Sequence, residues 1–257
     1  MSCKKLIGRS LVIVLLAAGA RVWAQPQVIA HRGYWDCPGS AQNSLSSLEN
    51  AHKAGVYGSE FDVSLTSDGV AVVNHDDTFQ GMKIETTPYE KLKKLCLANG
   101  EKLPSLEEYL ARGKELGHMK LILEIKPHKR VVNEDRAVET VLALVKKHNL
   151  EDRVEYISFS MNICKELIRR APKARVSFLG GQVSPQDLKT LGFTGLDYHY
   201  QVFDKHPDWL GEARRLGLTV NVWTVDDPAA MRSLIERGVD FITTNRPLEV
   251  QQLIGKK

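Results

Sequence analysis

Short apolar, β-branched runs alternate with helix-like segments along most of the 257-residue chain. A short apolar run bounded by turn residues predicts a buried strand, and apolar side chains three and four residues apart predict a helix. Eight such units in succession are typical of a (β/α)8 TIM barrel, an α/β fold that fills roughly 250 residues as one domain. The predicted barrel strands are residues 28–30, 59–63, 121–125, 154–159, 175–179, 195–198, 219–225 and 241–243.

Capping residues mark the ends of several predicted helices. Ser105 and Glu108 have the spacing of a capping box, and Asp227 precedes a proline at the first helical position, Pro228. Glycines that can end helices occur at Gly117, Gly217 and Gly238. These signals agree with the boundaries that the apolar spacing predicts.

One segment departs from the repeat. The second predicted strand is followed, after the turn sequence Ser67, Asp68 and Gly69, by another apolar run at residues 70–73 that leads to His75. A parallel crossover needs about a dozen residues or more, so this connection predicts an antiparallel hairpin inserted after the second strand. The hairpin would return His75 to the C-terminal rim of the barrel, where barrel enzymes hold their active sites.

The first 24 residues have the pattern of a secretory signal peptide. A basic start is followed by the apolar run of residues 11–20 and by small residues before Gln25. The run is shorter than the roughly 20 residues that a membrane-spanning helix needs, so we expect no stable membrane anchor. Residues 25–257 would then form a single exported domain, periplasmic or secreted. Its cysteines, Cys37, Cys96 and Cys164, could form one disulfide with a free thiol or remain three buried thiols.

The formal net charge of +4 is confined to this N-terminal segment. The segment holds Lys4, Lys5, Arg9 and Arg21 and no acidic residue, so the rest of the chain balances 31 basic residues with 31 acidic ones. A neutral domain gives no electrostatic support for a nucleic-acid partner. The oligomeric state is left open by the sequence.

Two neighbouring predicted strands, residues 59–63 and 121–125, carry acidic residues that could share one site. Glu60 and Asp62 lie two apart and share one face of a strand, and Glu124 lies at the end of the next barrel strand. Buried carboxylates are costly unless they are paired or bind a cation. One interpretation is an internal salt-bridge network with Lys126 and Arg32. The other is an all-oxygen site for one divalent cation, Mg²⁺ or Ca²⁺, because zinc would prefer His and Cys ligands.

Two histidines are expected at the same rim. His31 ends the first strand, and His75 follows the hairpin. One imidazole can remove a proton from an attacking oxygen while the other protonates the leaving oxygen. Arg32 offers a planar fork for phosphate oxygens, and Lys126 adds a second positive charge beside the predicted metal site. This combination favours an enzyme that acts on an anionic phosphodiester.

The chain resembles the glycerophosphodiester phosphodiesterases, a family of the PLC-like phosphodiesterase superfamily. The segments that carry the resemblance read IAHRG, SEFDVSLTSDGVAVVNHD, LPSLEEYL, LILEIKP, VNVWTVD and ITTNRP; they occur in the family's order and are spread over nearly all of residues 25–257. The resemblance implies that His31 and His75 are the acid/base pair and that Glu60, Asp62 and Glu124 hold the metal. It also implies that Arg32 and Lys126 contact phosphate and that Trp223 lines the substrate pocket.

The chain departs from the family pattern at one position. Where the family usually reads P-E-N-T, this sequence reads Ala41, Gln42, Asn43 and Ser44, so Gln42 replaces an acidic residue. The three carboxylates are intact, so metal binding should survive. The polar network behind Arg32 should differ, and with it the substrate preference or the rate.

The predicted activity is metal-dependent hydrolysis of glycerophosphodiesters to an alcohol and glycerol 3-phosphate. Attack by the neighbouring glycerol hydroxyl through a cyclic phosphate and direct attack by water are both compatible with the sequence. The alternatives are a phosphodiesterase for intact lipid or phosphoinositide headgroups, a barrel enzyme that uses Lys126 as a Schiff-base nucleophile, and a non-catalytic module that binds a metal or ligand. The preferred headgroup alcohol is not predicted.

Overall fold

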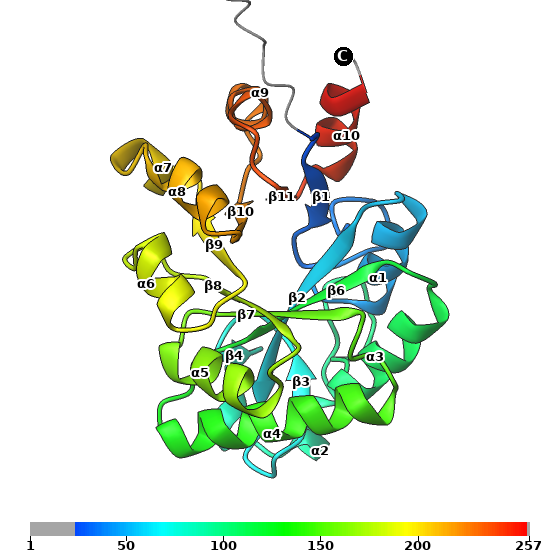
Figure 1. Ribbon diagram of the computed structural model, residues 1–257. Helices are drawn as coiled ribbons and strands as arrows, with labels where there is room; N and C mark the ends of the chain where they lie inside the picture. Colours follow the sequence, from blue (N-terminus) through cyan, green and yellow to red (C-terminus); the bar gives the residue numbers. More distant parts are fainter. Residues whose placement is uncertain (1–23, 256–257) are drawn as a thin grey trace, which may run out of the picture.

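The computed structural model describes residues 24–255, so all but the last residue of the predicted signal peptide lies outside the described residues. Eight parallel strands form a closed barrel, as predicted, because β1 pairs with both β11 and β2 (Figure 1). The barrel strands are β1 (Gln27–Ala30), β2 (Gly58–Leu65), β6 (Lys120–Ile125), β7 (Val154–Ser158), β8 (Arg175–Phe178), β9 (Gly195–His199), β10 (Thr219–Trp223) and β11 (Phe241–Thr244).

Helices surround the barrel (Figure 1). They are α1 (Leu45–Lys53), α3 (Leu106–Glu115), α4 (Val131–Lys147), α5 (Met161–Arg170), α6 (Pro185–Thr190), α7 (Val202–Lys205), α8 (Trp209–Arg215), α9 (Pro228–Arg237) and α10 (Pro247–Gly255). The capping box of Ser105 with Glu108 begins α3, and Asp227 caps α9 ahead of Pro228. Gly238 ends α9 with a left-handed backbone at φ 71°, a conformation that glycine adopts without steric cost. Local cap chemistry therefore sets these ends as predicted.

Successive side chains of each barrel strand point alternately outward and inward, which gives two separate apolar layers. Phe61, Val63 and their counterparts on neighbouring strands pack outward against the helices in the large core. A smaller cluster inside the barrel contains Ile29, Ile122 and Ile157. Residues of β2 and β6 that alternate with the outward-facing ones therefore point into the barrel.

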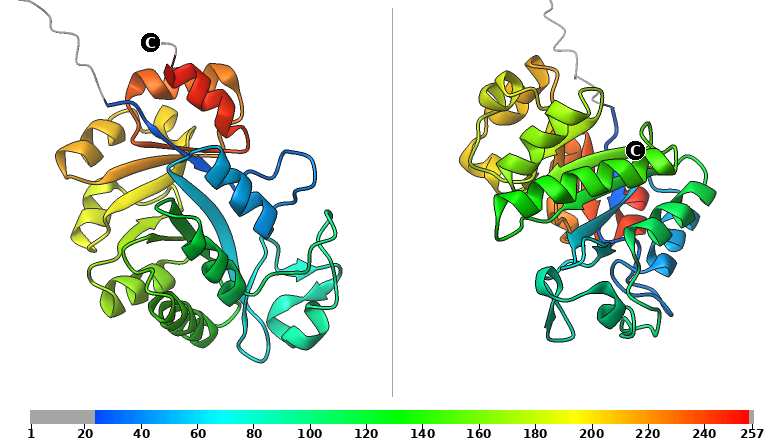
Figure 2. Two further views of the ribbon diagram at one scale, coloured as in Figure 1. Left: turned by 90° about the vertical axis from the view of Figure 1, so that its right-hand side faces the viewer. Right: turned by 90° about the horizontal axis from the view of Figure 1, so that it is seen from below.

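The predicted hairpin is present, and the insertion around it is larger than predicted. β2 pairs antiparallel with β3 (Ala71–Val73), with Val63 opposite Val73. The chain then forms the small antiparallel sheet of β4 (Thr78–Phe79) and β5 (Met82–Lys83), the 3-10 helix η1 (Ile84–Thr86) and α2 (Tyr89–Leu92). Figure 2 shows this cyan and teal segment standing out from one side of the barrel. It has its own apolar cluster, which includes Val72, Ile84 and Leu103.

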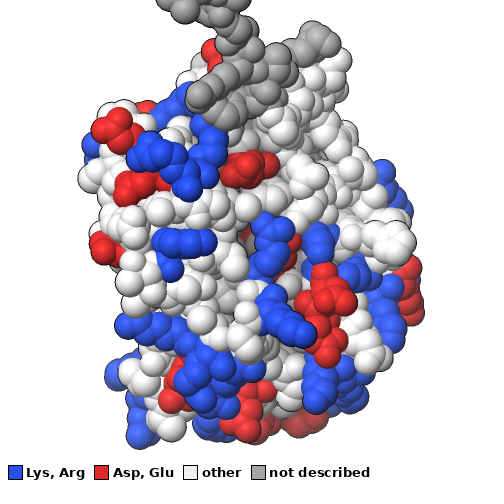
Figure 3. All heavy atoms as spheres, viewed as in Figure 1, with Lys and Arg blue, Asp and Glu red and all other residues white. Residues whose placement is uncertain are grey.

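Basic and acidic side chains are interspersed on the face seen in Figure 3. Within residues 24–255, no helix has the length and apolar character needed to cross a bilayer.

The three cysteines of this range are all free; Cys164 is buried, whereas Cys37 and Cys96 are half-buried. In the structure, neither the disulfide nor a set of three buried thiols is found among these residues.

Candidate active site

A cavity at the C-terminal rim of the barrel brings together residues from four separate segments. His31 and Arg32 follow β1, Glu60 comes from β2, His75 follows β3, and Glu124 comes from β6. The empty space within the cavity and its open mouth is about 480 Å³. Other lining residues are Ile157, Phe159, Leu179, Asp197, Trp223 and Thr243.

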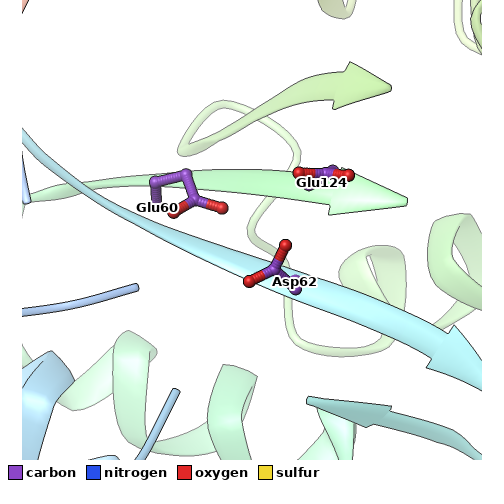
Figure 4. A group of neighbouring side chains, drawn as sticks. All are labelled: Glu60, Asp62 and Glu124. Atoms are coloured by element: carbon purple, nitrogen blue, oxygen red, sulfur yellow. The ribbon is translucent and has the colours of Figure 1, made fainter. Parts of the chain in front are cut away.

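The three carboxylates of Glu60, Asp62 and Glu124 converge inside the barrel (Figure 4). One oxygen from each lies within 4.8 Å of the others, and all three side chains are buried. Lys126 Nζ lies 2.8 Å from Glu124 Oε1 and 3.2 Å from Asp62 Oδ1. Arg32 Nε lies farther away, 3.8 Å from Asp62 Oδ2. The ion pairs of the salt-bridge interpretation are therefore present, but two cations face three carboxylates.

The electrostatics of this cluster follow from that imbalance. Burial and the neighbouring carboxylates of Asp62 and Glu124 raise the pKa of Glu60 well above its ordinary value. Burial and Asp62 likewise raise the pKa of Glu124 to about 8. Burial would also raise the pKa of Asp62, but Lys126 and a hydrogen bond from Asn43 hold it below its ordinary value. The positive charges of Lys126 and Arg32 are therefore too few to balance all three carboxylates.

These residues fit a hard divalent cation. All three donors are carboxylate oxygens, which are the ligands that Mg²⁺ and Ca²⁺ take in proteins. A bound cation would also supply the missing positive charge. Zinc would prefer His or Cys ligands, and neither belongs to this group of three carboxylates.

Arg32 is held by a strained turn and a side-chain contact. Its backbone has φ 56° and its amide donates to Glu60 Oε2 at 2.8 Å. The next residue, Gly33, has φ 77°, and a Cβ there would lie 2.3 Å from Ser47 Oγ on α1. The guanidinium donates from Nη1 to Gln42 Oε1 at 2.6 Å. Gln42 therefore supports Arg32 with a neutral acceptor where the family pattern has a carboxylate.

A hydrogen-bonded chain behind His31 defines which ring nitrogen carries its proton. Asn245 Nδ2 donates to Asp226 Oδ2 at 2.6 Å, and Trp35 Nε1 donates to Asn245 Oδ1 at 3.0 Å. This orients the amide so that Oδ1 accepts from His31 Nδ1 at 2.9 Å. The neutral imidazole therefore keeps a lone pair on Nε2. Burial and the adjacent Arg32 lower the pKa of His31 to about 4.

The remaining predicted residues occupy distinct places. His75 lines the cavity, and its Nδ1 lies 2.7 Å from Asp76 Oδ1. Trp223 also lines the cavity and donates from Nε1 to the backbone oxygen of Asp197 at 3.0 Å. Lys126 is not among the residues that line the cavity and contacts the carboxylates of Asp62 and Glu124, so its contact with phosphate stays a prediction. The structure thus brings seven of the eight predicted residues to the cavity or the carboxylate cluster within it, with Lys126 beside them.

Sequence reasoning missed several residues that shape the site. Asn43 donates from Nδ2 to Asp62 Oδ2 at 2.9 Å, and Asp226 and Asn245 support His31. These residues lie within or next to segments that carry the family resemblance. The sequence of those segments does not show which side chains pair with each other in the folded protein. His128, which the sequence did not single out, is half-buried and accepts a hydrogen bond at Nε2 from the Leu65 amide at 3.1 Å.

Solved structures of other proteins share this fold. A glycerophosphodiester phosphodiesterase from Parabacteroides distasonis has a similar crystal structure, with a TM-score of 0.89 and 53% identity over 90% of this chain and 97% of that chain. A phosphodiesterase from Oleispira antarctica, solved in complex with the product sn-glycerol-3-phosphate, gives a TM-score of 0.79 and 27% identity over 90% and 98% of the two chains.

Sequence comparison leads to the same family. The glycerophosphodiester phosphodiesterase of Caldanaerobacter subterraneus subsp. tengcongensis is 28% identical over 243 residues, which cover 89% of this chain and 98% of the relative. The model of the glycerophosphoryl diester phosphodiesterase family matches residues 31–249. The chain therefore belongs to the glycerophosphoryl diester phosphodiesterase family and is an enzyme of this type.

Proposed function

We propose that the protein hydrolyses glycerophosphodiesters to an alcohol and glycerol 3-phosphate with the help of one divalent cation. The observation that carries this proposal is the cavity in which two histidines and Arg32 face the buried carboxylates. The product bound to the Oleispira antarctica relative supports a substrate of this class. The expected partner is thus a small phosphodiester.

Glu60, Asp62 and Glu124 would hold the cation, Mg²⁺ or Ca²⁺. When bound, it supplies positive charge that stabilises negative charge developing on the phosphate oxygens. Asn43 fixes one oxygen of Asp62 by its hydrogen bond, which leaves the rotamer of this ligand defined. Lys126 balances the charge of the cluster and holds Asp62 and Glu124 in place.

His31 would remove a proton from the attacking oxygen. Its Nδ1 hydrogen is committed to Asn245 Oδ1, so Nε2 is the nitrogen available to act as a base. His75, which also lines the cavity, would protonate the leaving oxygen. Arg32 would hold a phosphate oxygen through its guanidinium, since its backbone turn and Gln42 already fix its position. Trp223 would pack against the organic part of the substrate.

The Schiff-base alternative is disfavoured by the surroundings of Lys126. A nucleophilic lysine needs a lowered pKa. Burial alone would lower the pKa of Lys126, but Asp62 and Glu124 raise it above its ordinary value. The ammonium form is thereby stabilised, which suits a structural cation and opposes nucleophilic attack.

The test is a chelation and metal add-back assay on glycerophosphocholine, glycerophosphoethanolamine, glycerophosphoinositol and intact lipids. We expect release of glycerol 3-phosphate from the deacylated diesters, loss of turnover with chelator, and recovery with Mg²⁺ or Ca²⁺. Chelator-insensitive turnover with borohydride trapping would support the Schiff-base mechanism instead. Metal binding without turnover of any substrate would indicate a non-catalytic module.

We also propose that residues 1–24 direct export and are removed. The support is the order of basic, apolar and small residues in this segment. Cell fractionation and N-terminal sequencing test it: a mature chain that begins at Gln25 in the exported fraction is expected. A full-length chain retained inside the cell would contradict it.

A further inference from the structure

The cavity contains a buried carboxylate that the proposed chemistry does not use. Asp197 lies on β9 with its side chain directed into the barrel, and the residue is 2% exposed. Its Oδ1 atom has no hydrogen-bond partner among the described residues. Burial raises the pKa of Asp197 to about 7, and a hydrogen bond from the Asn221 side chain offsets only part of that rise. An unsatisfied buried carboxylate is costly, so its position calls for a partner.

The polar side chains beside Asp197 also form hydrogen bonds with each other. Asn221 lies opposite Asp197 in the register of β9 and β10, and Thr243 follows on β11. Asn221 Nδ2 donates to Thr243 Oγ1 at 2.9 Å, and Thr243 Oγ1 in turn lies 3.2 Å from Asn221 Oδ1. Asp197 and Thr243 both line the cavity. The three side chains form a polar row, in which Asp197 Oδ1 is the acceptor that has no hydrogen-bond partner among the described residues.

Apolar side chains surround this polar row. Ile157 and Leu179 belong to the apolar cluster inside the barrel, with Trp223 packed against it. The Phe159 ring meets the Trp223 ring edge to face, with centroids 5.7 Å apart. Trp223 is itself fixed to the Asp197 backbone through its indole nitrogen. The cavity thus combines aromatic and aliphatic walls with a polar acceptor at Asp197.

The barrel is closed beneath Asp197. Gly195 lies two residues earlier and so faces the same side of β9. A Cβ at Gly195 would lie 2.4 Å from Thr219 Oγ1 and 2.6 Å from Ser177 Oγ. These close approaches leave no room for a side chain at Gly195, so the barrel is tightly packed below Asp197, which is reached from the cavity that it lines.

We propose that Asp197 is a specificity-determining residue that accepts a hydrogen bond from a hydroxyl group of the substrate's glycerol moiety. This inference rests on the proposed function, because every substrate of that class carries glycerol. Apolar walls suit the carbon atoms of a short polyol, and the open acceptor suits its hydroxyl. A trimethylammonium headgroup has no donor to offer to Asp197.

Equilibrium binding to the metal-loaded protein tests the proposal. Calorimetric titration with glycerol 3-phosphate and with ethyl phosphate compares two ligands that share a phosphate and differ in their hydroxyls. The wild type should prefer glycerol 3-phosphate, and Asp197→Ala should reduce that preference roughly ten- to hundredfold, the usual effect of losing a hydrogen bond to a charged group. Asp197→Asn, which keeps an acceptor and the side-chain shape, should retain part of it.

Ser177→Ala serves as the matched control, because Ser177 points into the barrel from the neighbouring strand and does not line the cavity. It should leave the preference unchanged. Turnover adds a second comparison: Asp197→Ala should lower kcat/KM equally for glycerophosphocholine and glycerophosphoethanolamine.

Three outcomes would overturn the assignment. The first is a folded Asp197→Ala variant that prefers glycerol 3-phosphate over ethyl phosphate as strongly as the wild type does. The second is a wild type that binds both ligands equally. The third is a loss of kcat/KM in Asp197→Ala that is confined to glycerophosphoethanolamine, which would show that Asp197 binds a headgroup ammonium. A wild type that binds neither ligand and hydrolyses no glycerophosphodiester would refute the proposed function as well.

Discussion

Replacing Asp197 by asparagine should stabilise the protein at pH 8 and much less at pH 5. Burial raises the pKa of this carboxyl from 3.8 to about 7. Between these two values the native state keeps the proton that the unfolded chain has released, so the stability of the wild type falls as the pH rises. Each pKa unit corresponds to about 1.4 kcal/mol, and the full cost above pH 7 is therefore on the order of 4 kcal/mol.

Asparagine has nearly the same shape and never ionises, so this cost is absent in the variant. Urea denaturation of both proteins in the same buffers gives the difference in the free energy of unfolding, in which the titration of other groups cancels. The stability of Asp197→Asn relative to wild type should increase by about 3 kcal/mol between pH 5 and pH 8, which is about two pKa units. A difference that stays constant over this range would show that Asp197 is ionised as easily in the folded protein as in the unfolded chain.

Three further substitutions follow from the described contacts. Gln42→Glu places a carboxylate against Arg32 Nη1, so the charge-assisted hydrogen bond should raise the thermal midpoint of unfolding; a lower midpoint would contradict it. Asn245→Ala removes the acceptor that orients His31 and should lower kcat roughly ten- to hundredfold with metal affinity unchanged, as kinetics and metal titration can show; an unchanged kcat would argue against the oriented base. Ser105→Ala removes the cap of α3 and should cost about 1 kcal/mol in urea denaturation while activity is retained, and loss of activity in the folded variant would be unexpected.

The barrel could be predicted from the sequence because its signals are local. Each strand is a short apolar run, and caps such as Ser105 with Glu108 mark helix ends in adjacent residues. The short turn after β2 also predicted the pairing of β2 with β3. The β4–β5 sheet was missed because each of its strands has two residues, too few for any periodicity.

The site residues that could be predicted are those whose charged side chains lie on a buried strand. Glu60 and Asp62 stand out because carboxylates are unusual on a buried strand, and the structure places both beside Glu124. The chain from His31 through Asn245 to Asp226 could not be predicted in this way. Its members are 214 and 19 residues apart, and polar residues in loops carry no pattern that identifies their partners. Asp197 was overlooked for a similar reason, since it lies alone within an ordinary strand.

Release of glycerol 3-phosphate from glycerophosphocholine by wild type, His31→Ala and His75→Ala tests the central claim most directly. Metal affinity is measured alongside by titration, so that a loss of turnover can be separated from a loss of the cation. We expect each variant to bind metal like the wild type and to lose roughly 10²- to 10⁴-fold in kcat. Full activity in both variants, with the metal bound, would contradict the acid/base roles of the two histidines.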